Sequence, residues 1–168
     1  MTTSLEALLS GVLQQEPLAR HTTFRIGGPA RYFFIARTPS SVIRALRAAK
    51  SSKTPFFVLA GGSNVVMSDK GFRGLVIYIK ILDHAMRGTR VSAGAGVPMA
   101  LLVREAGKRG LAGLEWAGGL PGTLGGAVRG NAGAFGGEIK DSVVSVKAID
   151  EKGKVRTFSR AQCKFSYR

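Results

Sequence analysis

The sequence predicts an α+β fold of two subdomains, the second of them incomplete at its C-terminus. In the first half of the chain, strand and helix patterns alternate, which is typical of a parallel βαβ unit. In the second half, two strand patterns are separated by a short turn, which is typical of an antiparallel hairpin. The second half also contains a glycine-rich segment, residues 107–137, with 12 of the 23 glycines. We therefore place a first subdomain at residues 1–80 and a second at residues 81–168.

Apolar spacing predicts two helices and three strands in the first subdomain. A short helix carries Leu5 and Leu9 on one face and starts at a capping box formed by Thr3 and Glu6. The other elements are a helix at 39–50 and strands at 31–36, 56–60 and 75–79. The strand at 56–60 is entirely apolar, so we expect it to be buried in a parallel sheet. We expect residues 17–30 to be irregular.

The second subdomain begins with a connection that extends to residue 88. Its expected elements are a strand at 90–93, a helix at 98–109, a hairpin of strands at 143–150 and 155–158, a helical turn at 159–163 and the start of a strand at 165–168. Gly110 follows the helix, where it fits a C-cap. The last strand pattern has no partner after it, so we expect a domain that is cut within an element.

Composition excludes several classes of protein. No run approaches the ~18 apolar residues that a membrane-spanning helix needs. The first 14 residues lack the basic start of a secretory signal, and the single cysteine, Cys163, cannot form an intramolecular disulfide. No group of histidine, cysteine and acidic residues has the spacing of a metal site. These features predict a cytoplasmic location and no bound metal.

The net charge of +15 indicates anionic partners. Its distribution argues against a dedicated nucleic-acid surface, because no run of five basic residues occurs and basic residues do not alternate with aromatic ones. A solvated basic surface is the favoured interpretation of the charge.

A turn of sequence GGSN, residues 61–64, follows directly after the apolar strand at 56–60. Successive backbone N–H groups in such a turn can bind an anion, and glycine permits the positive φ that this geometry needs. The turn is neither a P-loop nor a dinucleotide-binding GxGxxG motif. A plain turn remains the alternative interpretation.

The glycine-rich segment offers a second candidate site. Its sequence GGLPGTLGGA at 118–127 continues to NAGAFGG at 131–137. The glycines leave backbone donors without side chains, while Thr123 and Asn131 supply polar groups. Such a surface suits a flat ring with polar edges and a diphosphate. A purely structural glycine tract is the alternative.

Five motifs together carry a specific resemblance that covers residues 18–168. They are HTTFRIGGPA at 21–30, LAGGSNVVMSDKGFRGLVI at 59–77, GAGV at 94–97, GLEWAGGLPGTLGGAVRGNAGAFGGEI at 113–139 and CKFSYR at 163–168. Their order and spacing are similar to those of the UDP-N-acetylenolpyruvoylglucosamine reductase family, flavoproteins of peptidoglycan precursor synthesis.

The resemblance implies a vanillyl-alcohol-oxidase-like (PCMH-type) FAD-binding fold, with non-covalent FAD between two subdomains. It places the FAD diphosphate on residues 61–64. The flavin site that it implies consists of Gly61, Gly62, Ser63, Asn64, Pro121, Gly122, Thr123, Gly125, Gly126, Asn131, Ala132 and Gly133.

The same resemblance implies the reaction. A hydride passes from NADPH to the flavin and on to the enolpyruvyl double bond of UDP-N-acetylglucosamine enolpyruvate, and a proton from the enzyme completes UDP-N-acetylmuramate. The catalytic residue implied is Arg168, which would bind the substrate carboxylate. The family continues beyond this position into a substrate-binding domain, so we expect a fragment that is inactive alone and needs that domain in trans. The alternatives are an FAD oxidase of the same fold and a basic module that binds nucleotides or nucleic acid without catalysis.

Overall fold

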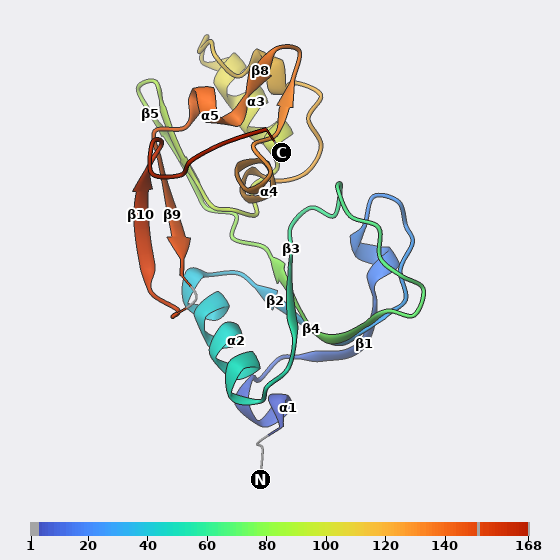
Figure 1. Ribbon diagram of the computed structural model, residues 1–168. Coiled ribbons are helices and arrows are strands. Elements are labelled where there is room, and N and C mark those ends of the chain that lie inside the picture. The colour runs from blue at the N-terminus through green and yellow to red at the C-terminus, as the bar shows by residue number, and fades with distance from the viewer. Residues whose placement is uncertain (1–3, 151, 168) are drawn as a thin grey trace. The chain divides into compact units, whose positions relative to one another are not determined.

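The computed structural model describes residues 4–150 and 152–167. The chain divides into two compact units, Met1–Ile81 and Leu82–Arg168, and each is described by itself. Figure 1 traces both units along the chain from blue to red. No helix among the described residues is long and apolar enough to cross a membrane.

The N-terminal unit is built on a mixed four-stranded sheet (Figure 1). Its strands, in the spatial order β1-β2-β4-β3, are β1 (Leu13–Pro17), β2 (Pro29–Ala36), β4 (Phe72–Ile79) and β3 (Phe56–Leu59). Both β2 and β3 run parallel to β4, while β1 pairs with β2 in the antiparallel direction. The carboxyl ends of the three parallel strands therefore lie at one edge of the sheet.

Three helical segments accompany this sheet: α1 (Leu5–Leu8), the 3₁₀ helix η1 (Leu18–His21) and α2 (Pro39–Ser51). Helix α2 contacts β2 and β4. It begins at Thr38, whose hydroxyl accepts a hydrogen bond from the backbone N–H of Ser41 at 3.1 Å. Pro39 occupies the first helical position, where its missing N–H costs nothing. The predicted helix at 39–50 is thus confirmed.

The core of this unit consists of side chains from β2, β3, β4 and η1. Its fully buried members are Leu18, Ala30, Phe33, Leu59 and Val76. The ring of Phe33 also stacks on His21, with ring centroids 4.3 Å apart. The strands predicted at 31–36, 56–60 and 75–79 supply three of these five residues, Phe33, Leu59 and Val76, so the apolar spacing located much of the core.

Several sequence predictions for this unit need correction. The N-cap of α1 is Ser4, and Thr3, expected in the capping box, lies outside the described residues. Residues 18–21, expected to be irregular, form η1. Residues 13–17 form β1, which the sequence did not predict because LQQEP is polar and lacks a clear alternation.

Strand β3 exists as predicted but is buried only in part: Leu59 is buried, whereas Phe56 is 50% exposed and Val58 is 48% exposed. The reason is its position at the sheet edge, where it has a single neighbouring strand.

The C-terminal unit contains small hairpins and short helices. Its elements are β5 (His84–Arg87), β6 (Arg90–Ala93), α3 (Met99–Lys108), the 3₁₀ helix η2 (Glu115–Ala117), α4 (Leu124–Arg129), β7 (Gly133–Ala134), β8 (Gly137–Glu138), α5 (Ile139–Ser142), β9 (Ser145–Ile149) and β10 (Val155–Ser159). The pairs β5–β6, β7–β8 and β9–β10 are all antiparallel.

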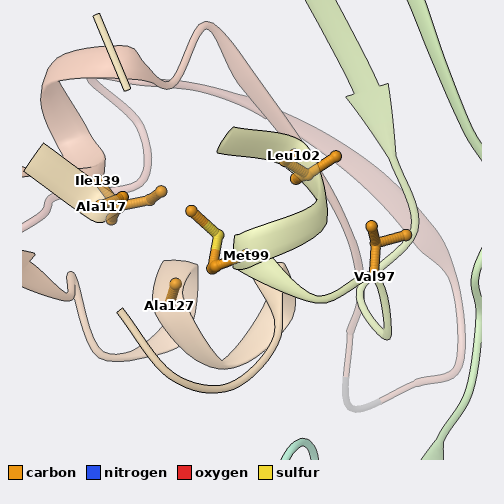
Figure 2. Close-up of a cluster of buried hydrophobic side chains, with 6 residues drawn as sticks. All are labelled: Val97, Met99, Leu102, Ala117, Ala127 and Ile139. Carbon is orange, nitrogen blue, oxygen red and sulfur yellow. The ribbon is translucent and has the colours of Figure 1, made fainter. Parts of the chain in front are cut away.

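A compact apolar cluster holds the helices of this unit together. Figure 2 shows Met99, at the start of α3, pointing toward Ala117 and Ile139. The other fully or nearly fully buried members are Val97, Leu102 and Ala127. This cluster joins η2, α4 and α5 to α3. Because η2 and α4 both lie within the glycine-rich segment, the cluster also fixes that segment.

Helix α3 ends at Lys108, one residue earlier than the sequence predicts. Gly110 has φ +65°, and its N–H donates to the carbonyl of Gly107 at 3.0 Å. The N–H of Leu111 donates to the carbonyl of Ala106 at 3.0 Å, which completes a Schellman motif. The C-cap itself is Arg109 rather than Gly110, which is the next residue.

Other expectations for the C-terminal unit need correction. Residues 84–87 form a strand that the sequence treated as a connection, because HAMR has no apolar alternation. Residues 165–167 carry no strand. The helical turn expected at 159–163 is present, since the N–H of Cys163 donates to the carbonyl of Ser159 at 3.1 Å. The predicted hairpin of residues 143–150 and 155–158 is confirmed by the pairing of β9 with β10.

We predict that Phe33→Ala lowers the free energy of unfolding of the N-terminal unit by about 3–5 kcal/mol, because it opens a cavity at a fully buried position. Chemical denaturation measures this change. Phe24→Ala is the matched control, since Phe24 is 58% exposed and should change stability by no more than about 0.5 kcal/mol. Equal losses in the two variants would contradict the assigned core.

Candidate functional site

The GGSN turn lies at the carboxyl end of β3. Gly62 is buried and has φ +68°, which favours glycine. A Cβ atom at this position would overlap the carbonyl oxygen of His21. The Gly62 carbonyl accepts a hydrogen bond from the N–H of Thr23 at 3.0 Å. Gly62 is therefore required for packing the turn against the segment that follows η1.

The backbone N–H groups of this turn, residues 61–64, have no acceptor among the described residues of the protein, 4–150 and 152–167. The side chain of Ser63 is half-buried and that of Asn64 is exposed. Consecutive unbonded N–H groups beside a hydroxyl and an amide provide the donors that a diphosphate accepts.

In the C-terminal unit, the segment before α3 pairs with the segment before α4. The N–H of Leu124 donates to the carbonyl of Val97 at 2.8 Å, and the N–H of Gly125 donates to that of Ala95 at 2.9 Å. A Cβ on Gly125 would lie 2.7 Å from the Cβ of Ala95. Gly122, with φ +94°, accepts from the N–H of Met99 at 3.1 Å. Two of the sequences singled out above, GAGV at 94–97 and GGLPGTLGGA at 118–127, are thus hydrogen-bonded to each other.

Thr123 occupies the N-cap of α4 but makes no capping hydrogen bond through its side chain. Its Oγ1 is buried and has no hydrogen-bond partner among the described residues, a property that it shares with Nε1 of Trp116. A buried hydroxyl without a partner costs about 1–3 kcal/mol. A ligand that accepts or donates at Thr123 would remove this cost.

Asn131 joins three parts of the C-terminal unit through its side chain. Its Nδ2 donates to Oε2 of Glu138 at 2.6 Å and to the carbonyl of Ser166 at 3.0 Å. Its Oδ1 accepts from the N–H of Lys140 at 3.2 Å. Asn131 is 6% exposed and has φ +39°, so these bonds hold a backbone conformation that few residues other than glycine adopt.

The carboxylate of Glu138 is stabilised by its neighbours. Its Oε2 accepts from Nζ of Lys140 at 2.7 Å and from Asn131. These two hydrogen bonds hold the pKa of Glu138 below its ordinary value. The same ion pair raises the pKa of Lys140. The sequence analysis did not single out Glu138, because only the fold brings it beside Asn131.

The remaining predicted residues are distributed as follows. Pro121 and Gly126 are exposed, and Ala132 and Gly133 are half-buried where the chain enters β7. The four residues of the GGSN turn lie in the N-terminal unit, and the other eight predicted cofactor residues lie in the C-terminal unit. Arg168, the predicted catalytic residue, lies outside the described residues.

A comparison with protein families identifies the chain. Residues 30–159 match the family described as "FAD binding domain". The chain belongs to this family. The match includes both the GGSN turn and the segment from Pro121 to Gly133, so both candidate regions fall within the FAD binding domain.

Curated relatives make the resemblance more specific. The UDP-N-acetylenolpyruvoylglucosamine reductase of Caldanaerobacter subterraneus subsp. tengcongensis is 40% identical over 165 residues, which are 97% of this chain and 55% of that protein. The crystal structure of UDP-N-acetylenolpyruvylglucosamine reductase from Thermus caldophilus is 32% identical, with a TM-score of 0.76 over 94% of this chain and 55% of that one. The chain spans about half the length of the relatives it matches.

A more distant likeness defines the fold. The structure of 6-hydroxy-D-nicotine oxidase from Arthrobacter nicotinovorans has a TM-score of 0.73 at 20% identity, over 96% of this chain and 38% of that one. Together with the family match, it assigns this FAD binding domain to the vanillyl-alcohol-oxidase-like fold. The predicted fold class is confirmed.

We predict that Gly62→Ala destabilises the N-terminal unit by at least about 1–2 kcal/mol, because alanine is strained at positive φ and its Cβ would overlap the backbone of His21. Thermal unfolding measures the loss. Gly119→Ala provides the control, since no atom lies within 4 Å of a Cβ built there. An alanine at position 62 that is tolerated as well as one at 119 would contradict this packing.

We also predict that the Glu138 carboxyl group titrates below 4.5 in the folded chain. Its carboxylate stabilises the fold at pH values above 4.5, and this contribution is lost as the pH falls through the lower folded-state pKa. A carboxyl-carbon NMR titration measures the pKa. Lys140→Met should raise it, whereas Lys108→Met, which removes a lysine paired with Glu105, should leave it unchanged. No change in the Lys140 variant would contradict the assigned cause.

Proposed function

We propose that the chain binds FAD non-covalently as part of a UDP-N-acetylenolpyruvoylglucosamine reductase. The observation that carries the proposal is the buried, unpartnered hydroxyl of Thr123, together with the unbonded N–H groups of residues 61–64. Both are polar groups that FAD can satisfy, and both lie within the segment that matches the FAD binding domain family.

The residues divide between two tasks. Gly61, Gly62, Ser63 and Asn64 would bind the diphosphate through their N–H groups and polar side chains. The residues that would line the rest of the cofactor are Pro121, Gly122, Thr123, Gly125, Gly126, Asn131, Ala132 and Gly133. We propose that a first subdomain, residues 1–80, and a second, residues 81–168, each supply one of these sets.

Bound FAD supplies hydride transfer, which amino-acid side chains cannot perform. We propose NADPH as the hydride donor and UDP-N-acetylglucosamine enolpyruvate as the acceptor, in the cytoplasm, where peptidoglycan precursors are made. Arg168 would bind the substrate carboxylate with two donors and stabilise negative charge that develops beside it. The 40% identity to a reductase, against 20% to an oxidase of the same fold, favours reduction of a nucleotide sugar over oxidation of a small alcohol.

We predict that the purified chain, incubated with FAD and desalted, retains a flavin absorption spectrum with shifted fine structure. Thr123→Val should weaken FAD binding by about tenfold, because it removes a hydroxyl that the cofactor would satisfy. The same variant should unfold at an unchanged or higher temperature without FAD, since it deletes an unpartnered buried group. Thr157→Val, at an exposed position of β10, is the control.

Two results would contradict this assignment. If the folded chain retained no flavin, residues 61–64 and 121–133 would not be sufficient to form an FAD site. The reductase activity is tested separately, in a chimera that joins residues 1–168 to the C-terminal part of the Caldanaerobacter relative. NADPH oxidation that depends on the enolpyruvyl sugar is the expected result, and a chimera that binds FAD but lacks this activity would contradict the proposed reaction.

A further inference from the structure

A basic cavity of about 300 Å³ opens on the N-terminal unit, away from the GGSN turn. Its lining residues are Gln15, Pro29, Arg31, Lys70, Phe72 and Arg73. Pro29 and Arg31 lie at the start of β2, and Phe72 and Arg73 lie at the start of β4. Since residues 61–64 follow the carboxyl end of β3, and β2, β3 and β4 are parallel, the cavity and the turn belong to opposite edges of the sheet.

Strand pairing is irregular at this cavity, on both sides of Arg31. Between β2 and β4, Ala30 pairs with Phe72 but Tyr32 pairs with Leu75, so two residues of β4 face Arg31 alone. One of these two is Arg73. Such a bulge changes the direction in which a side chain points and is common beside binding sites.

The pairing with β1 is interrupted at the same residue. Gln14 pairs with Tyr32 and Glu16 pairs with Ala30, but Gln15 and Arg31 between them do not pair. Gln15 has φ +52°, a strained conformation for a residue with a side chain. Both irregularities therefore centre on residues that line the cavity.

The charges of the cavity are not neutralised by the protein. Three of its six lining residues are cationic, and none is acidic. Among the described residues, none of the three cations forms an ion pair, although Arg31 lies 5.0 Å from the ring centroid of Tyr32. Glu16 of β1 follows Gln15 of the cavity lining. Its carboxylate is bonded to His21 at 3.0 Å and lies 3.9 Å from Arg20. Like charges around one cavity repel one another, and a multivalent anion would relieve that repulsion.

We propose that this cavity binds the phosphate group of a small phosphate ester. The guanidinium groups of Arg31 and Arg73 suit phosphate because each can present two parallel donors, and Lys70 adds a point charge. Pro29 and Phe72 offer apolar surface to the part of the ligand that carries the phosphate. A volume of about 300 Å³ is at the lower end of small-molecule sites, which favours a compact ligand over a dinucleotide.

The test is an NMR titration of the full chain with glucose 6-phosphate, in the presence of saturating FAD. Saturable shifts of the backbone amides of Gln15 and residues 70–73 are expected, and glucose should produce none. The double variant Arg31→Ala, Arg73→Ala should weaken binding at least about tenfold. The matched control is Arg37→Ala, Lys50→Ala, which removes the same charge from exposed positions outside the cavity and should leave binding unchanged.

Several outcomes would overturn the proposal. Equal weakening in both double variants would mean a general effect of charge, and shifts confined to residues 61–64 would mean binding at the GGSN turn. Sedimentation with phosphatidylglycerol vesicles, without saturable binding of glucose 6-phosphate, would assign the cavity to a membrane surface instead. Should the alanine variant fail to fold, Arg31→Lys, Arg73→Lys keeps the charge, and its loss of paired donors should still weaken binding. If the chain failed to bind FAD but still bound glucose 6-phosphate at the cavity, the proposed function would be contradicted and the phosphate site would not.

Discussion

In the N-terminal unit, loops pack against the sheet at points where two backbone segments lie very close together. At these points there is no space for a Cβ atom. Gly62 lies against His21, Gly28 against the carbonyl of Asp69, and Gly71 against the carbonyl of Pro29. At each point a side chain would force the segments apart, so glycine is required by packing. The position of the GGSN turn depends on one of these contacts, and the position of the chain entering β4 depends on the other two.

The same constraint shapes the glycine-rich segment of the C-terminal unit. Gly125 lies against Ala95, and a Cβ on Gly137 would overlap the side chain of Trp116. The N–H of Gly125 itself donates to the carbonyl of Ala95, so this glycine serves the packing of the segment. The GGSN turn differs, because its N–H groups have no protein acceptor among the described residues, and the binding of FAD that we propose draws on such groups.

Local spacing predicted the elements whose burial follows a simple period. Strands β2 and β4, helices α2 and α3, and the β9–β10 hairpin all agree with their apolar patterns. The sequence did not predict edge strand β1 or hairpin strand β5. Few of their side chains are buried, so these strands do not need apolar residues at regular positions. The contact of Asn131 with Glu138 and Ser166, and the irregular pairing around Arg31, arise from tertiary packing and leave no periodic signal.

The net charge of +15 leaves many cationic side chains without a carboxylate partner. With 25 basic and 10 acidic residues, 15 cations would lack a partner if every carboxylate paired with one of them. The carboxylates that do form pairs, such as Glu16, Glu138 and Asp150, bond to residues close to them in sequence. Cations at Arg31, Lys70 and Arg73 are left around a common cavity, where repulsion disfavours their approach unless an anion is shared. The folded chain therefore carries unneutralised positive charge at this cavity. Small anions, and not carboxylates of the protein, are suited to neutralise it.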